Sequence, residues 1–113
     1  MKINILGQEY TYYETDLNCL DVPEADGFCR IYDKEIIVRQ EEFLDGDTEA
    51  GKRYRKESVI RHELVHAFAE ESGVSYGEDE VLVDWIAHMI PKINAVFQKI
   101  VEEYPNESKD ADQ

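Results

Sequence analysis

The chain has 113 residues, 42% of them apolar and 34% charged, a composition that predicts one folded domain with a single modest core. Its formal net charge of −14 repels phosphate backbones, which argues against direct binding to nucleic acid. No apolar run approaches the ~20 residues that cross a bilayer, and the first residues lack the apolar stretch of a signal peptide, so we expect a cytoplasmic protein with no membrane partner.

A first β-hairpin is predicted at the amino terminus. Segments 2–6 and 9–14 contain apolar residues that alternate with polar ones, as in half-buried strands, and they flank a turn at Gly7 and Gln8. Residues 15–26 contain many turn-forming residues, so we predict that they form a connecting loop.

A second hairpin is predicted at residues 28–39. Segments 28–32 and 35–39 flank a short turn, and the second segment contains the run Ile-Ile-Val, whose β-branched side chains favour an extended chain. Residues 40–52 are polar and contain glycine, and the apolar periodicity stops there. We therefore predict that this stretch is a loop.

The apolar spacing changes to that of a helix at residues 54–72, and Gly73 is suited to end this helix. A second helix is predicted at about residues 78–104, where apolar residues form one stripe. We expect the stripe to face the core, and Pro91 to kink or break the helix near residues 88–90. The stripe consists of Leu82, Trp85, Ile86, Met89, Ile90, Ile93, Phe97 and Ile100.

These elements predict a single α+β domain at residues 1–104. A small antiparallel sheet of two hairpins packs against the first helix, and the second, long and Pro-kinked helix crosses behind it. Residues 105–113 are acidic and lack apolar residues that could pack, so we predict a disordered tail. Because Cys19 and Cys29 form no CxxC motif, we interpret them as reduced thiols rather than as metal ligands.

The first predicted helix contains the sequence His-Glu-Leu-Val-His at residues 62–66. Imidazoles at positions i and i+4 project from the same helix face, so His62 and His66 can share one metal ion. Neutral imidazole suits Zn²⁺, and a catalytic zinc site needs a third protein ligand and a place for water. Glu63 lies where a general base would take a proton from that water. The alternative is that these side chains are simply solvated on the polar face of the helix.

The second predicted helix offers candidates for the third ligand. Glu80 and Asp84 are four residues apart, and a short loop would fold them back against the two histidines. Glu80 could provide an oxygen ligand, while Asp84 could accept the outward N–H of a ligating imidazole. His88, one turn further, is an alternative ligand or a stabiliser of the tetrahedral intermediate. The competing explanations are a helix-dipole role for Glu80 and solvent exposure for the other two side chains.

With HELVH at residues 62–66 and EVLVD at residues 80–84, the sequence resembles the gluzincins, in which HExxH is followed by ExxxD on a later helix. More closely, residues 28–93 resemble small, often phage- or prophage-encoded metallopeptidases of the ImmA/IrrE type. Characterised members of that group cleave transcriptional repressors, and many sit beside a helix-turn-helix protein. The resemblance therefore implies that the substrate is a protein, and that it could be a repressor of the helix-turn-helix type. It also implies zinc ligands at His62, His66 and Glu80, a catalytic base at Glu63 and an imidazole-orienting carboxylate at Asp84.

The favoured interpretation is a zinc metallopeptidase that hydrolyses a peptide bond in a protein substrate. Segment 35–39 is expected to be an edge strand that pairs with the extended substrate, and His88 or Tyr76 is expected to stabilise the oxyanion. Two other classes stay open. One is a non-catalytic domain in which zinc braces two helices, and the other, suggested by the charge of −14 alone, is an acidic inhibitor of a nucleic-acid-binding protein.

Overall fold

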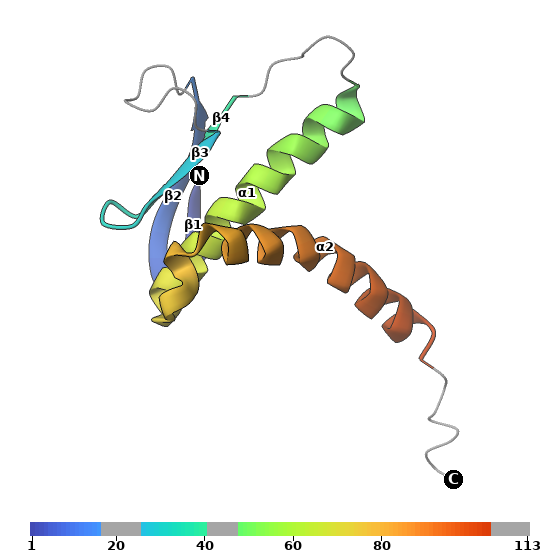
Figure 1. Cartoon of the computed structure of the whole chain (residues 1–113). Coiled ribbons are helices and arrows are strands. Elements are labelled where there is room, and N and C mark those ends of the chain that lie inside the picture. Colours follow the sequence, from blue (N-terminus) through green and yellow to red (C-terminus); the bar gives the residue numbers. More distant parts are fainter. Residues whose placement is uncertain (17–25, 41–47, 105–113) are drawn as a thin grey trace.

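The computed structural model describes residues 1–16, 26–40 and 48–104, which form a four-stranded sheet and two long helices (Figure 1). The predicted tail at residues 105–113, Cys19 and most of the predicted loop at residues 15–26 lie outside the described residues. The elements are β1 (Lys2–Ile5), β2 (Gln8–Thr15), β3 (Gly27–Arg30), β4 (Glu35–Arg39), α1 (Glu49–Ser72), the 3₁₀ helix η2 (Ser75–Glu78) and α2 (Glu80–Glu102).

The predicted α+β class is confirmed, and both predicted hairpins form, as β1–β2 and β3–β4. The strand order is β1-β2-β4-β3, and β2 pairs with β4 in parallel, with Tyr12 opposite Ile36. The sheet is therefore mixed, not wholly antiparallel as predicted. The physical reason is that β2 and β4 are each the second strand of a hairpin, so they run in the same direction where the hairpins meet.

The strand order also corrects the predicted edge strand. Segment 35–39 lies inside the sheet as β4, with a neighbour on each side, whereas β3 has a single neighbour and forms the edge. In the first hairpin, the tight turn is made by Leu6 and Gly7, both with positive φ (51° and 91°), and not by the predicted pair that starts one residue later. Two successive positive φ values match the right-handed twist of the flanking strands.

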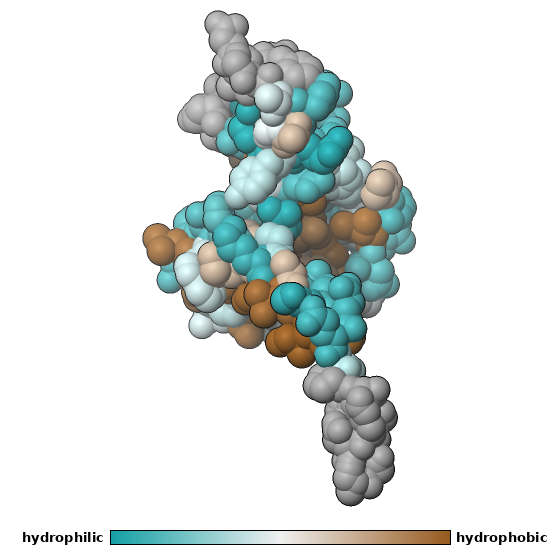
Figure 2. All heavy atoms as spheres, turned by 90° about the vertical axis from the view of Figure 1, so that its right-hand side faces the viewer, coloured by the Kyte–Doolittle hydropathy of each residue, from teal (hydrophilic) through white to brown (hydrophobic). Residues whose placement is uncertain are grey.

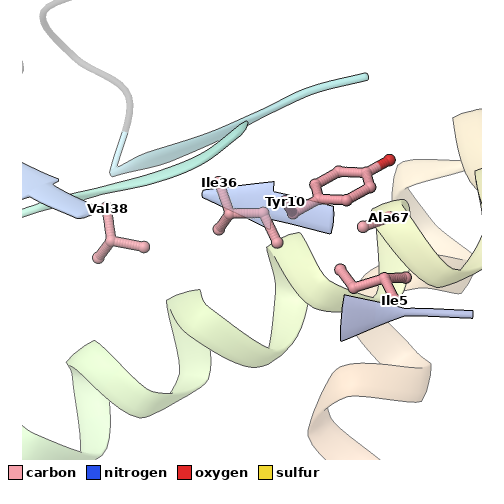
Figure 3. Close-up of a cluster of buried hydrophobic side chains, with 5 residues drawn as sticks. All are labelled: Ile5, Tyr10, Ile36, Val38 and Ala67. Atoms are coloured by element: carbon pink, nitrogen blue, oxygen red, sulfur yellow. The ribbon is translucent and has the colours of Figure 1, made fainter. Parts of the chain in front are cut away.

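The main core lies between one face of the sheet and α1. Figure 3 shows side chains from β1, β2 and β4 between the sheet and α1, and these side chains and Ala67 of α1 are almost completely buried. Each such side chain contributes roughly 1.5 to 3 kcal/mol relative to an exposed position, so this cluster fixes α1 on the sheet. Its members are Ile5, Tyr10, Ile36, Val38 and Ala67.

Helix α1 ends at Ser72, as predicted, and Gly73 caps it with a left-handed φ of 80°. Its start differs from the prediction, because the helix begins at Glu49 and not near residue 54. The Thr48 side chain caps this end by accepting a hydrogen bond of 3.0 Å from the backbone N–H of Gly51. Gly51 therefore belongs to the first helical turn, and residues 49–52 of the predicted loop are helical, while residues 41–47 lie outside the described residues.

Helix α2 continues through Pro91 without a break, and in Figure 1 its axis changes direction part-way along its length. Proline has no backbone N–H, so the carbonyl of Ala87, four residues earlier, loses its partner within the helix. Arg61 of α1 replaces that partner, because its Nε donates to the Ala87 oxygen over 3.2 Å. The carbonyl that proline frees thus becomes an anchor between the two helices.

The prediction that the whole apolar stripe of α2 faces the core was wrong. Val83 and Ala87 are buried against Val65 of α1, but the apolar side chains further along α2 are largely exposed. The reason is visible in Figure 1, where α2 crosses α1 near its own start and then extends away from the sheet. Neither helix in the described part of the chain has a stretch that is long and apolar enough to span a membrane.

The bond between Arg61 and Ala87 predicts a specific energetic coupling to Pro91. We expect Arg61→Met to lower the free energy of unfolding by about 1 to 3 kcal/mol, because a partly buried carbonyl then lacks a donor. In a Pro91→Ala background the new N–H serves that carbonyl, so the same substitution should cost less. A double-mutant cycle measured by urea denaturation tests this coupling. An equal cost in both backgrounds would contradict it.

A second prediction concerns Glu71 at the end of α1, which accepts hydrogen bonds from Lys34 Nζ and from the buried Tyr10 hydroxyl (2.7 Å). Lys34 first, and then Tyr10, hold the pKa of the Glu71 carboxyl below its ordinary value. A pKa lowered by folding gives stability that is present above the unfolded-state value of about 4.3 and is lost as the pH falls through the folded value. Glu71→Gln should therefore flatten the acid limb of a stability-versus-pH curve, and an unaltered limb would refute this role.

Candidate metal centre

Helix α1 directs His62 and His66 towards the first residue of α2, Glu80. The Nε2 atom of His62 lies 3.0 Å from Glu80 Oε1, and the Nε2 atom of His66 lies 3.2 Å from Glu80 Oε2. One ligand atom from each of the three residues lies within 4.8 Å of the others. Ligands about 2.1 Å from a tetrahedral zinc ion lie about 3.4 Å apart, so this spacing fits one small cation.

The hydrogen bonds of His66 indicate which of its ring nitrogens is protonated and which one carries a lone pair. Its Nδ1 lies 2.7 Å from the carbonyl oxygen of Gly77, and a carbonyl can only accept, so Nδ1 carries the proton. In the neutral ring, Nε2 then presents a lone pair towards a Glu80 carboxylate oxygen. Two acceptors at this distance repel each other unless a proton or a cation lies between them, so the donor set fits a bound cation.

His62 has a comparable outer partner. Its Nδ1 lies 3.4 Å from Asp84 Oδ1, and its Nε2 faces Glu80. A carboxylate next to Nδ1 favours the tautomer in which Nε2 is free to bind a metal. The structure thus places Asp84 beside a histidine, outside the three-residue group, as the sequence predicted for an orienting carboxylate.

The connection between the helices determines where Glu80 lies. Gly73 ends α1, η2 follows, and the Asp79 side chain caps α2 by accepting from Leu82 N over 3.1 Å. Gly77 within η2 approaches α1 so closely that an added Cβ would lie 3.0 Å from the Cβ of Ala69. This close approach brings the Gly77 carbonyl within reach of His66.

Glu63 lies on the buried side of the same helix, with only 8% of its surface exposed. Burial raises the pKa of its carboxyl group, and the charges of His62 and His66 oppose that rise. Within residues 1–16, 26–40 and 48–104, no hydrogen bond or ion pair reaches this carboxyl. A carboxyl with a raised pKa and no competing donor is well suited to accept and return a proton.

A cavity of about 800 Å³ lies between the edge strand β3 and the group formed by His62, His66 and Glu80. Its walls include Phe28 and Cys29 from β3, Tyr32 from the following turn, and the side chains of the candidate site. Burial, followed by the negative charge of Glu63, raises the pKa of the Cys29 thiol to about 12. Cys29 lies outside the three-residue group that the described residues bring together, so it is not among the candidate ligands.

Two residues proposed as oxyanion donors do not line this cavity. His88 lies at a second hollow of about 280 Å³, which it shares with His62, Glu63 and Asp84. Tyr76 packs against the core cluster formed by Val65, Val83 and Ala87. Neither residue belongs to the three-residue group that the described chain brings together.

Sequence reasoning missed two contributors, Tyr32 and Gly77. Tyr32 is almost completely exposed at a cavity wall, and an aromatic residue at the end of a predicted strand, next to the hairpin turn, was the signal that could have found it. Gly77 acts through its backbone carbonyl, for which no side-chain pattern exists.

No family model, curated protein or solved structure matches this chain. The resemblance to ImmA/IrrE-type metallopeptidases therefore stays a prediction. The functional argument rests on the geometry and chemistry of the site.

The packing around Gly27 generates a prediction about the position of Glu63. A Cβ at Gly27 would lie 2.9 Å from Val59 Cγ1, 3.1 Å from the Ile37 carbonyl oxygen and 3.2 Å from Glu63 Cγ. We expect Gly27→Ala to lower the free energy of unfolding by about 1 to 3 kcal/mol, because α1 must move away from β3. Gly51→Ala is the matched control, since its added Cβ would lie 3.3 Å from one side-chain atom, Thr48 Oγ1, and should cost less stability than the three contacts at Gly27. Equal stabilities of the two variants in thermal unfolding would contradict this packing.

Proposed function

We propose that this protein is a zinc-dependent metallopeptidase. The observation that carries the proposal is the convergence of two imidazole nitrogens and one carboxylate on a single point, directly beside a buried carboxyl group. Imidazole and carboxylate ligands in this number are typical of catalytic zinc sites, which keep one position for water or substrate. A purely solvated polar face gives no account of these converging acceptors.

In the proposed mechanism, His62, His66 and Glu80 hold the ion, while Asp84 and the Gly77 carbonyl fix the orientation of the imidazoles. A bound Zn²⁺ supplies Lewis acidity, which polarises a carbonyl group and lowers the pKa of a water molecule. Glu63 would accept a proton from a water molecule in the site and give it to the leaving amine.

A peptide is the proposed substrate because β3 is an edge strand and forms part of the cavity wall. An extended chain can pair with the free backbone groups of such a strand, which would place its amide next to the histidines. The strand proposed to pair with the substrate is therefore β3, and not β4 as the sequence predicted. A repressor of the helix-turn-helix type as the natural substrate and a cytoplasmic location are further parts of the proposal, supported by the resemblance and the composition alone.

Metal binding is the first test. We expect the purified full chain to bind about one zinc ion by isothermal titration calorimetry and elemental analysis. His62→Ala combined with His66→Ala should abolish this binding, whereas His88→Ala, the matched histidine control, should bind as wild type does. Asp84→Asn should weaken binding by about 10- to 100-fold, as outer partners do. Full zinc occupancy in the double histidine variant would refute the site.

Glu63→Gln provides the second arm of the same test. We expect this variant to bind zinc with little change and to lose hydrolysis of quenched-fluorescence peptide pools by at least about 100-fold. Retained turnover would remove Glu63 from the proton-transfer role. Zinc that raises the melting temperature without hydrolysis of any probe by the wild type would instead support the braced, non-catalytic domain.

A further inference from the structure

The second half of α2 presents an apolar face that nothing in residues 1–16, 26–40 and 48–104 covers. Ile93, Phe97 and Ile100 are 61%, 55% and 57% exposed, and this half of the helix lies beyond its contact with α1. Figure 2 shows hydrophobic residues gathered directly above the grey residues that follow α2. We define the α2 face as Trp85, Met89, Ile90, Ile93, Val96, Phe97 and Ile100.

The spacing of this face is that of helix pairing. Positions 89, 93, 96 and 100 are separated by steps of four, three and four, and all four are apolar. A repeat of 3.5 residues keeps one seam facing a partner helix, whereas a helix on a globular core needs only the period of 3.6. The α2 face therefore fits another helix that lies along it.

The size of the face suits a stable dimer. From the exposed fractions of its side chains, its accessible apolar area is on the order of 700 Å², above the roughly 300 to 600 Å² of the largest patch on a typical monomer. A standard interface buries about 800 Å² on each partner. One copy of α2 laid against another would therefore bury an area that specific dimers need.

The charged residues near the α2 face favour a second copy of the chain as its partner and an antiparallel orientation of the two helices. Residues 85–101 contain Lys92 and Lys99 and no acidic residue, although the whole chain carries −14, so this is where two copies repel each other least. Glu103 is the C-cap residue just beyond α2, where it pairs with Lys99 over 2.9 Å, and at 100° per residue it lies on the same flank as Lys92. An antiparallel pair puts equal flanks side by side, so Lys92 of one copy lies near Glu103 of the other, whereas a parallel pair puts Lys92 opposite a flank without acids.

We infer that the α2 face is the docking surface for a second copy of this chain, in an antiparallel and twofold-symmetric α2–α2 pair. The same residue of each copy contributes to such an isologous contact, which closes and does not polymerise. Within the described residues Lys92 makes no ion pair, so it is available to the second copy. This inference does not depend on the proposed hydrolase activity, because Glu80 and Asp84, the residues that α2 contributes to the candidate site, precede every residue of the α2 face.

Sedimentation equilibrium of the full chain at about 100 µM tests the pairing. We expect a mass of twice 13.2 kDa with a dissociation constant of about 10 µM or tighter. The double variant Ile93→Glu, Phe97→Glu should raise this constant by about 100-fold or more. Val81→Glu is the matched control, because Val81 is 81% exposed on the same helix but outside the face, and it should dimerise as wild type does.

The orientation has its own test. Lys92→Glu should weaken dimerisation by about 10-fold, and Glu103→Lys in that background should restore it. A monomeric wild type, or a dimer that survives the Ile93→Glu, Phe97→Glu change, would overturn the inference. A monomer that binds phosphatidylglycerol vesicles through this face would overturn it in favour of a membrane surface. If the Ile93→Glu, Phe97→Glu variant binds zinc as the wild type does, dimerisation and zinc binding are independent of each other.

Discussion

Two imidazole nitrogens and a carboxylate that are directed at one point need a proton or a cation between them. This constraint links the crossing of the helices to the chemistry of the site. The Gly77 carbonyl fixes the His66 tautomer, and Glu80 lies at the first residue of α2, so the distance between the histidines and the carboxylate depends on how α1 and α2 meet. A small shift of either helix would separate these groups and break up the three-residue group that could hold a cation.

Several contacts oppose such a shift. The Val65–Val83–Ala87 cluster excludes water from the crossing, and Arg61 bonds to the carbonyl that Pro91 leaves free. On the other side of α1, the sheet packs so closely that Gly27 admits no side chain next to Glu63. The candidate site therefore lies between two rigid interfaces, one with α2 and one with β3, and this arrangement holds its carboxyl groups in a defined geometry.

Local sequence patterns predicted the elements well, because turn chemistry, helix capping and periodicity act over a few residues. The histidine pair and Glu80 could be found for the same reason, since spacing on a helix determines which side chains share a face. The parallel pairing of β2 with β4 could not be predicted, because no local signal in either strand specifies which strand of another hairpin it will meet. The exposed half of α2 was missed because an apolar stripe has the same pattern whether it meets the core or a separate surface.

The mixed sheet contains contacts between residues far apart in the sequence, whereas the candidate site depends on contacts between residues close together. The candidate ligands are at most 18 positions apart in sequence, so a helical hairpin alone brings them together through local contacts. The parallel ladder between β2 and β4 instead joins segments that lie 24 positions apart, and such non-local pairing slows folding because a long loop must close first. The wall formed by β3 also meets α1 through non-local contacts, such as Gly27 with Val59, while the ligand-bearing helices depend on local ones.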